Sequence, residues 1–371
     1  MYSLAAYASM MADLTRIDAY VMALRHAVRA DSIVADLGAG TGTFALLAAR
    51  LGARKVHAIE PDEAIHVGRA IAAASGLADR IDFIQARSTD VVLEERATII
   101  VSDMRGTLPL FERHIPSIVD ARDRLLAPSG VLIPRRDRLR AAIVEAPDVY
   151  ADHVAPWRDR TYDLDLRPAQ EMLANTWRRI RLAPDMLLSD SESLATLDYR
   201  ERSDPDLDAE ATWAARRAGT AHGLCVWFDS ELIDGVTLSN APDQPHAIYA
   251  QAFFPFATPV ALDEGASISV RLQANLVGDD YLWRWTSHGR TQSTLYGLPL
   301  GASQLPKSAA DHVPALTTEG EIDLFIMRRM QESIPLGEIA SELLTRFPSA
   351  LRNRNAALGR AGELARKYSK G

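Results

Sequence analysis

The stretch that decides the fold is Val34-Ala35-Asp36-Leu37-Gly38-Ala39-Gly40-Thr41-Gly42-Thr43-Phe44-Ala45-Leu46-Leu47. It predicts a short apolar strand, a glycine-rich turn and the first turns of a helix. Glycines at three alternate positions let the backbone pass close to a ligand, because a Cβ atom at these places would collide with it: Gly38, Gly40 and Gly42. The stretch therefore predicts a ligand-binding turn at the start of a parallel sheet.

A second predicted strand, Val56-His57-Ala58-Ile59-Glu60, follows the glycine turn and ends in a carboxylate. A carboxylate at the end of this strand can accept hydrogen bonds from both hydroxyls of a ribose. The two strands together predict the nucleoside-binding first half of a doubly wound α/β sheet.

The spacing of the glycines indicates which nucleoside is bound. The dinucleotide fingerprint is G-x-G-x-x-G, whose turn cradles a pyrophosphate, whereas this chain has G-x-G-x-G with Asp36 just before the turn. An acidic residue there suits a cofactor with an amino acid tail and no phosphate. We therefore favour S-adenosylmethionine (SAM), with a nicotinamide or flavin dinucleotide and a ligand-free glycine turn as the alternatives.

Composition sets further limits. The chain has 371 residues, of which 47% are hydrophobic and 24% charged, and a formal net charge of -8. This length allows two domains, and the charge gives no reason to expect binding to nucleic acid. No stretch is long and apolar enough for a membrane span, no secretory signal precedes the first helix, and the single cysteine, Cys225, allows no intrachain disulfide. We expect a cytoplasmic protein without a metal site, with Cys225 buried in the core.

Polar residues of the first half flank the predicted strands. Apolar residues at helical spacing predict a helix over 3–28, on which Arg16 either forms a surface ion pair with Asp13 or binds the cofactor's carboxylate. Thr89 follows the third predicted strand, 81–84, where an adenine edge would lie in a SAM fold or where a plain polar turn would suffice.

Two carboxylates follow the fourth predicted strand, 98–101. Ligands of open α/β sheets bind beyond the carboxyl ends of the strands, so Asp103 and Glu112 are placed for chemistry. The alternative is a purely structural role, in which Asp103 caps a helix and Glu112 lies on the solvent-exposed face of that helix.

The pattern of apolar and polar residues changes at Pro134. Alternating strand-like runs follow up to about residue 285 and predict an antiparallel β domain, a barrel or sandwich, with a helical insert near 168–180. The stretch 319–368 is again helical, with a break at 347–349. We expect an N-terminal helix and Rossmann-like domain over 1–134, a β-barrel-like domain over 135–300 and a C-terminal helical segment over 318–371.

Several local motifs now point to one family. Met10-Met11-Ala12-Asp13-Leu14-Thr15-Arg16 is similar to a segment M-L-x-D-x-x-R, and the nine-residue spacing of Asp103 and Glu112 matches a loop with two acids. Trp157–Asp165 is similar to W-x-x-V-Y-G-F-D, and the stretch 238–251 to L-S-T-x-P followed by T-H-W-x-Q. From about residue 7 to about residue 285 the chain resembles the protein arginine methyltransferases, as a divergent member.

The resemblance implies a role for each candidate residue. Arg16 would hold the methionine carboxylate of SAM, Glu60 the ribose, and Thr89 would lie near the adenine. Asp103 and Glu112 would grip a guanidinium and leave one nitrogen lone pair facing the methyl group. The resemblance also implies a homodimer, with the insert near 168–180 as its arm.

The chain departs from the family at four places. The first acid is Asp103 rather than glutamate, Arg105 stands where the family has methionine, Ala247-Ile248-Tyr249 replaces T-H-W, and Tyr7 stands where the family has histidine. A cation at position 105 would repel a sulfonium and a guanidinium unless it pairs with Asp103 or Glu112. The acceptor is therefore a guanidinium or another nitrogen of a protein, a peptide or a small molecule. The alternatives are a SAM-binding scaffold without activity and a dinucleotide oxidoreductase.

Overall fold

The structure is a computed structural model and describes residues 3–154, 164–297 and 313–369. Most of the segment Trp157–Asp165, used above for the family resemblance, lies outside these residues. The chain divides into two compact units, Met1–Pro299 and Leu300–Gly371, which are described separately.

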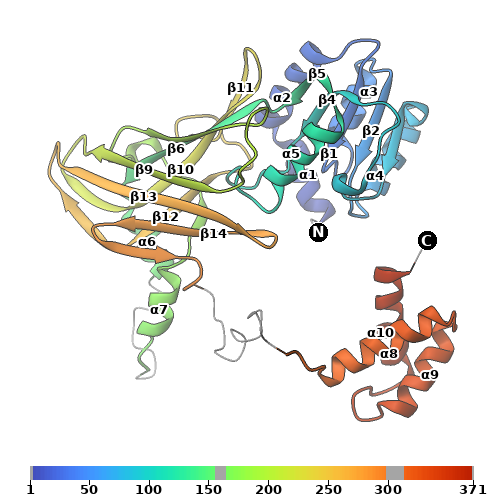
Figure 1. The fold of residues 1–371 in the computed structure, drawn as a ribbon. Coiled ribbons are helices and arrows are strands. Elements are labelled where there is room, and N and C mark those ends of the chain that lie inside the picture. The colour runs from blue at the N-terminus through green and yellow to red at the C-terminus, as the bar shows by residue number, and fades with distance from the viewer. Residues whose placement is uncertain (1–2, 155–163, 298–312, 370–371) are drawn as a thin grey trace. The chain divides into compact units, whose positions relative to one another are not determined.

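The first unit begins with the predicted parallel sheet (Figure 1). Its strand order is β3-β2-β1-β4-β5, and all four pairings are parallel. This order confirms the Rossmann-like, doubly wound architecture. The strands are β1 (Ile33–Leu37), β2 (Lys55–Ile59), β3 (Ile81–Ile84), β4 (Ala97–Ser102) and β5 (Leu126–Ile133).

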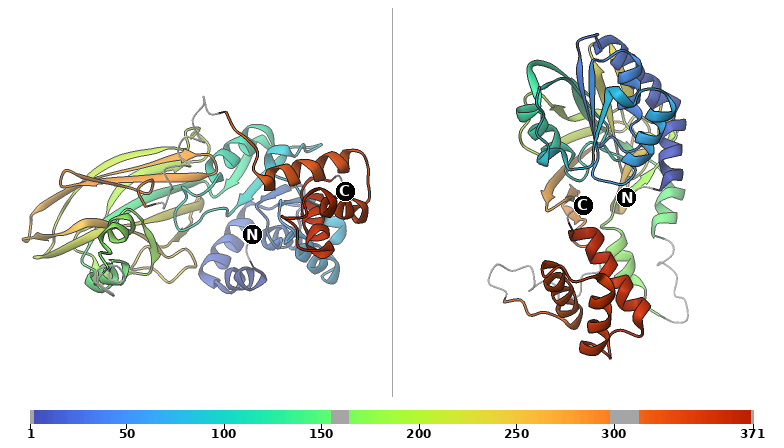
Figure 2. Two further views of the ribbon diagram at one scale, coloured as in Figure 1. Left: turned by 90° about the horizontal axis from the view of Figure 1, so that it is seen from below. Right: turned by 90° about the vertical axis from the view of Figure 1, so that its right-hand side faces the viewer.

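Helices cover both faces of this sheet, as Figures 1 and 2 show. The connections β1–β2 and β2–β3 run through α3 (Thr43–Arg50) and α4 (Ile65–Ala74). The connection β4–β5 runs through α5 (His114–Arg124). Right-handed crossovers that advance in opposite directions along the sheet place α5 on the face opposite α3 and α4.

The N-terminal segment forms two helices rather than the single predicted one. These are α1 (Leu4–Ala12) and α2 (Leu14–Ala27), separated at Asp13. The Asp13 carboxylate accepts a hydrogen bond from the backbone N–H of Arg16 at 3.2 Å and so caps α2. Of the two alternatives for Arg16, the surface ion pair with Asp13 does not form, because the Asp13 side chain binds backbone donors instead.

From Arg136 onward the first unit is antiparallel. One sheet has the order β7-β12-β10-β6-β8, with β11 paired to β10, and the other has the order β15-β14-β13-β9. The strands of the first sheet are β6 (Arg136–Val144), β7 (Arg178–Ile180), β8 (Glu192–Asp198), β10 (Gly219–Ile233), β11 (Val236–Ser239) and β12 (Gln251–Leu262). Those of the second are β9 (Leu207–Ala214), β13 (Ser267–Val277), β14 (Asp280–Ser287) and β15 (Arg290–Ser293).

These two sheets enclose one apolar core, which makes the predicted barrel-like domain. Buried aromatic side chains fill it, and two indoles donate to backbone carbonyls: Trp213 Nε1 to Ala141 O at 3.0 Å and Trp285 Nε1 to Pro255 O at 2.8 Å. The first of these bonds joins β9 to β6 and so ties the sheets together. Cys225 is fully buried, as expected, and burial raises the pKa of its thiol.

The insert near 168–180 is only partly helical. Helix α7 (Arg167–Leu173) ends early, and residues 178–180 form β7, which pairs with β12. A second helix, α6 (Pro147–Val154), precedes the insert.

The second unit contains the predicted C-terminal helical segment, which the structure divides into three helices. They are α8 (Thr318–Gln331), α9 (Leu336–Arg346) and α10 (Arg354–Tyr368). The break falls after Arg346, as expected from Pro348. The three helices share a small core of their own that includes Ile326, Leu343 and Leu364.

Candidate active site

The parallel sheet brings three sequence-predicted elements to one edge. The strand order reverses between β1 and β4, and ligands of such sheets bind at the carboxyl ends of the strands beside this reversal. Leu37, the last residue of β1, is in register with Ser102 on β4 and with Ile59 on β2. The glycine turn, Glu60 and Asp103 therefore leave neighbouring strands at the same edge.

The glycine turn needs its glycines for two reasons. Gly38, Gly40 and Gly42 have φ values of +65°, +54° and +76°, which other residues seldom adopt. In addition, a Cβ atom at Gly40 would lie 2.6 Å from the Tyr7 ring, and one at Gly38 would lie 2.5 Å from Met104 Cγ. Helix α1 and the loop after β4 thus pack directly against the turn.

Glu60 fixes the conformation of this turn. Its carboxylate accepts the backbone N–H of Gly40 at 2.9 Å through Oε2 and that of Asp62 at 2.9 Å through Oε1. Each oxygen of a carboxylate can accept two hydrogen bonds, so both retain capacity for a further donor such as a ribose hydroxyl.

Asp36 lies beneath the turn and is buried. Its Oδ2 accepts the backbone N–H of Ala45 at 2.8 Å, at the start of α3. Its Oδ1 has no hydrogen-bond partner among the described residues. Burial raises the pKa of Asp36 to about 7, although the Ala45 hydrogen bond opposes the shift.

Arg16 joins the N-terminal helices to the loop after β4. Its Nε donates to Asp103 Oδ2 at 2.5 Å and its Nη1 to Met10 O at 3.0 Å, and its guanidinium lies over the Phe44 ring. Within the described parts of the chain these bonds use Nε and Nη1 and leave Nη2 for another acceptor. The arginine that the sequence singled out is therefore a buried component of this edge, not a surface residue.

Asp103 is the centre of a buried polar cluster. Its Oδ1 accepts from Nε and Nη2 of Arg105 at 3.1 and 3.0 Å, and the Tyr249 hydroxyl lies 2.7 Å from Oδ2. Burial alone would raise the pKa of Asp103, but the charges of Arg16 and Arg105 and the Tyr249 hydrogen bond lower it to about 2.

The Arg105 side chain is fully enclosed, and it forms one of the two pairings that the sequence suggested, the one with Asp103. Besides Asp103, its guanidinium donates to Asp137 at 2.9 Å, to the Ser230 hydroxyl at 2.8 Å and to the Tyr20 hydroxyl at 2.6 Å. Asp137 also accepts a hydrogen bond from the Tyr199 hydroxyl at 2.6 Å. This hydroxyl lies 3.2 Å from His114 Nε2. Burial lowers the pKa of His114 to about 3, so it is neutral.

Sequence reasoning missed most of this cluster. Asp137, Tyr199 and Ser230 come from β6, the chain after β8, and β10, far along the chain from Arg105. The sequence carried one signal for it. Asp137 is a charged residue at a position of β6 that faces the interior, whereas the next inward positions are apolar.

Two sequence-predicted residues stand apart from this cluster. Glu112 and Thr89 are both exposed, and no hydrogen bond joins Glu112 to Asp103. Glu112 has a φ of +43°, which is uncommon for a residue with a side chain and marks a fixed turn just before α5. Thr89 lies in a short 3-10 turn, Ser88–Asp90, and bonds weakly to Asp90 at 3.4 Å.

The segment that replaces T-H-W is attached to the site in another way. Asp13 Oδ2 accepts the backbone N–H of Ile248 at 2.7 Å, and Tyr249 reaches Asp103. A backbone donor thus takes the place that a histidine side chain has in the family motif, while His246 is exposed.

The site fits SAM in the features that can be tested here. The turn lacks side chains where the backbone must come close to a ligand, and Glu60 retains acceptor capacity for hydroxyls. Among the residues that the structure describes, Arg16 Nη2 has no acceptor and is available to a carboxylate, and Asp36 Oδ1 is a buried acceptor without a donor.

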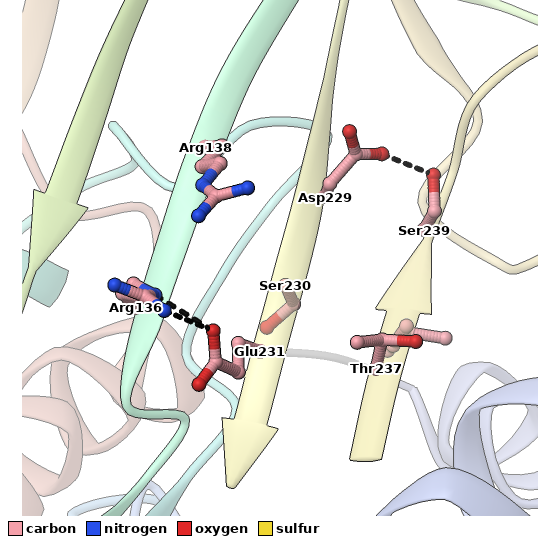
Figure 3. A pocket seen from close by; sticks show the side chains of 8 residues that line it. Arg136, Arg138, Asp229, Ser230, Glu231, Thr237 and Ser239 are labelled. Atoms are coloured by element: carbon pink, nitrogen blue, oxygen red, sulfur yellow. Dashed lines mark hydrogen bonds and ion pairs between the residues drawn. The ribbon is translucent and has the colours of Figure 1, made fainter. Parts of the chain in front are cut away.

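A cavity of about 260 Å³ lies on the other face of the strands that hold Arg105 (Figure 3). Arg136, Arg138 and Glu231 line it, and Arg136 pairs with Glu231 at 2.6 Å. Because residues alternate along a strand, these side chains point away from Asp137. Ser230, which accepts a hydrogen bond from Arg105, also lines the cavity, so the cavity borders the buried cluster.

Comparison with known families supports the same assignment for both halves of the first unit. Residues 17–152 match the family model of ribosomal protein L11 methyltransferase (PrmA). Residues 136–286 match that of the arginine methyltransferase oligomerization subdomain. The described residues contain no helix able to cross a membrane and no cluster of side chains suited to a metal ion.

Curated relatives carry related names. A probable histone-arginine methyltransferase 1.3 of Arabidopsis thaliana is 30% identical over 281 residues, covering 71% of this chain and 52% of the relative. An arginine N(omega)-methyltransferase of Streptomyces achromogenes subsp. streptozoticus is 28% identical over 269 residues, covering 71% and 74%. Human protein arginine N-methyltransferase 2 is 33% identical over 265 residues, covering 67% and 61%. The chain thus spans between about half and three quarters of the length of these relatives.

Solved structures share the fold. The Trypanosoma brucei PRMT1 enzyme–prozyme heterotetrameric complex with AdoHcy has a TM-score of 0.73 at 21% identity, covering 77% of this chain and 97% of that one. Arabidopsis thaliana protein arginine methyltransferase 10 has a TM-score of 0.68 at 22% identity, covering 79% and 98%. The parallel sheet and the antiparallel domain are therefore arranged as in these proteins.

Proposed function

We propose, from the premise that this chain belongs to the protein arginine methyltransferase-like family of class I SAM-dependent methyltransferases, that it transfers the methyl group of SAM to a nitrogen. The acceptor is a guanidinium or another nitrogen of a protein, a peptide or a small molecule. One observation carries the proposal: the buried bond between Arg16 and Asp103 joins helix α2 to the acidic loop at the switch point of the sheet, where the glycine turn also lies.

We propose a role in cofactor binding for seven residues. Gly38, Gly40 and Gly42 shape the turn, and Glu60 receives the ribose hydroxyls. Arg16 receives the methionine carboxylate through its remaining nitrogen, and Asp36 lies near the amino acid tail. Thr89 lies beside the adenine, in the turn that follows β3.

The acidic loop positions the acceptor nitrogen, with Asp103 and Glu112 as the candidate catalytic residues. SAM supplies an electrophilic methyl group: the acceptor nitrogen forms the new N–C bond as the S–C bond breaks, the electron pair stays on sulfur, and the nitrogen loses a proton. A carboxylate such as Glu112 holds the acceptor's N–H groups and orients the lone pair.

We also propose a cytoplasmic homodimer. Helix α7 has no buried residue in the isolated chain, and the matched family model is described as an oligomerization subdomain. Light scattering at micromolar concentration should give a mass of about 81 kDa, twice the 40.7 kDa of one chain. A mass of one chain would contradict the dimer but not the activity.

Production of S-adenosylhomocysteine from SAM tests the activity directly. Purified protein should form it with L-arginine or an arginine-containing peptide, and Glu112→Gln should reduce kcat by at least about a hundredfold. Titration calorimetry should show that the same variant binds S-adenosylhomocysteine as well as the wild type does. Full turnover by Glu112→Gln would contradict the role of the acidic loop.

A SAM-binding scaffold without activity is the second candidate. It is favoured by one observation, because protein donors already occupy both oxygens of Asp103. Binding of S-adenosylhomocysteine without turnover on any nitrogen acceptor would support it. Binding of NAD with no binding of SAM would instead support a dinucleotide oxidoreductase.

A further inference from the structure

Arg105 occupies a complete guanidinium site built by the chain itself. A guanidinium has five N–H donors, and the bonds of Arg105 supply an acceptor for each. Nε donates to Asp103, Nη1 to Asp137 and Ser230, and Nη2 to Asp103 and Tyr20. The side chain is 0% exposed, so no other molecule competes for these bonds.

Aromatic rings close the remaining sides of this site. The Arg105 guanidinium carbon lies 4.9 Å from the centre of the Phe228 ring and 5.5 Å from that of Tyr249. Carboxylates around the edge and ring faces above the plane are the groups that bind a guanidinium well.

Asp103 is correspondingly saturated. Oδ1 accepts from Arg105 and Oδ2 accepts from Arg16, while the Tyr249 hydroxyl lies within 2.9 Å of both oxygens. Its side chain is only 4% exposed. By contrast Glu112, nine residues along the same loop, is exposed.

We propose that Arg105 is a specificity-determining residue that withdraws Asp103 from acceptor binding and leaves Glu112 as the one carboxylate that grips the acceptor. The proposal rests on the proposed function and deepens it. Asp103 then acts on the cofactor side, by orienting Arg16. The acceptor is a nitrogen nucleophile held through one carboxylate, and an arginine side chain is held at one edge only.

The charge balance of the cluster supports this division. Arg16 and Arg105 offset Asp103 and Asp137, so the four buried side chains carry no net charge. An acceptor's guanidinium beside Asp103 would be the third one there and would face the cations of Arg16 and Arg105 at short range, where repulsion is weakly screened. Beside Glu112 it meets an unopposed carboxylate.

The test separates acceptor binding from cofactor binding. Steady-state kinetics with SAM and L-arginine or an arginine-containing peptide give the two KM values, and calorimetry gives the Kd of S-adenosylhomocysteine. The main variant is Arg105→Met with Asp137→Asn, which removes one buried charge of each sign and frees Oδ1 of Asp103. We expect it to lower the acceptor KM about tenfold and to change the cofactor Kd less than twofold.

Asp103→Asn then tests the same point in two backgrounds. With Arg105 present, Asp103→Asn should raise the Kd of S-adenosylhomocysteine about tenfold and alter the acceptor KM less than twofold. In the double variant it should raise the acceptor KM about tenfold. A tenfold rise in acceptor KM with unchanged cofactor Kd in the first background would overturn the proposal.

Two further variants control for misfolding. Arg105→Lys retains the charge with fewer donors and should keep the wild-type acceptor KM if charge, rather than shape, excludes the guanidinium; a tenfold fall would contradict this. Arg271→Met removes an exposed arginine paired with Asp208 on the second antiparallel sheet and should change neither constant. If the wild type bound S-adenosylhomocysteine but methylated no acceptor, the proposed function would fail. The Kd of S-adenosylhomocysteine for Asp103→Asn, measured by calorimetry, would still decide whether Asp103 acts on the cofactor side.

Discussion

Asp36 and Asp103 are buried aspartates at the same edge of the sheet, yet their pKa values move in opposite directions. Asp103 has two arginines beside it, and its pKa falls to about 2. Asp36 has one backbone donor and an orphan oxygen, and its pKa rises to about 7. A raised pKa means that the folded state binds the proton more tightly than the unfolded chain, whose aspartates titrate near 3.9.

The stability of the first unit should therefore depend on Asp36 in a defined pH window. Its contribution is fully present below about pH 4 and is lost as the pH rises through about 7, by at most about 4 kcal/mol for a shift of about three units. Asp36→Asn keeps the acceptor for Ala45 but cannot ionise. Urea unfolding at pH 4.5 and 7.5 should show that the free energy of unfolding falls less between these pH values in the variant than in the wild type. An equal fall in both proteins would contradict the raised pKa of Asp36.

Glu60 gives a second prediction for a single residue. Glu60→Gln retains one acceptor oxygen but replaces the other with a donor that faces a backbone N–H, so both the turn and the ribose contact suffer. We expect the Kd of S-adenosylhomocysteine to rise at least about a hundredfold, or about 2.7 kcal/mol. Glu95→Gln, on an exposed carboxylate paired with Arg54, is the matched control. Wild-type affinity in Glu60→Gln would exclude the ribose role.

Individual residues were predictable where their role follows from position relative to a strand end. Gly40 and Glu60 were identified because a parallel sheet places strand ends together. The partners of Arg105 were not, because Asp137 and Ser230 lie 32 and 125 residues away and belong to another sheet. No pattern within a single sequence reports such pairings.

At the scale of elements, the break between α1 and α2 was missed for a similar reason. No Gly or Pro marks it, and the apolar spacing continues through it. Asp13 ends one helix and caps the next, and it also holds the N–H of Ile248, 235 residues away. The strands β8 and β9 were missed for different reasons: β8 alternates weakly, whereas β9 alternates but has alanine at two of its four inward positions, which is a weak strand signal.

Helix α2 should depend on Asp13 for both its stability and its placement. Asp13→Ala removes a helix cap and leaves the Ile248 N–H unpaired, which should cost about 1–3 kcal/mol in urea unfolding. Because α2 carries Arg16, the Kd of S-adenosylhomocysteine should rise several-fold. Asp18→Ala, an exposed position on the same helix, should change neither quantity. Equal behaviour of the two variants would argue against the tether.

At the scale of the whole molecule, the chain divides into two compact units, and the described residues of each unit have a hydrophobic core. The class of each part was predictable, since β-strands alternating with helices, runs of strands and paired amphipathic helices differ in period. That the C-terminal helices have a core of their own could not be read from the sequence, because helices packing on a β domain show the same periodicity. The structure gives them a core that contains only their own side chains.

This division predicts that damage to the second unit stays local. Leu343→Asp puts a charge into the core of α8, α9 and α10, where Leu343 is fully buried. Circular dichroism should lose the signal of these helices, while calorimetry should show an unchanged Kd for S-adenosylhomocysteine. A weakened Kd would show that the helical unit supports the active site of the first unit.

The bond between Arg105 and Asp137 has a consequence for how such enzymes diverge. The arginine lies in the acidic loop and the aspartate in the first strand of the other domain, so exchange of the arginine alone leaves Asp137 as a buried ion without its guanidinium partner. A chimera that grafts a relative's acidic loop onto this chain's barrel should therefore express poorly until position 137 is changed as well. Positions 105 and 137 would therefore change together in evolution, and a change of acceptor would require substitutions at both.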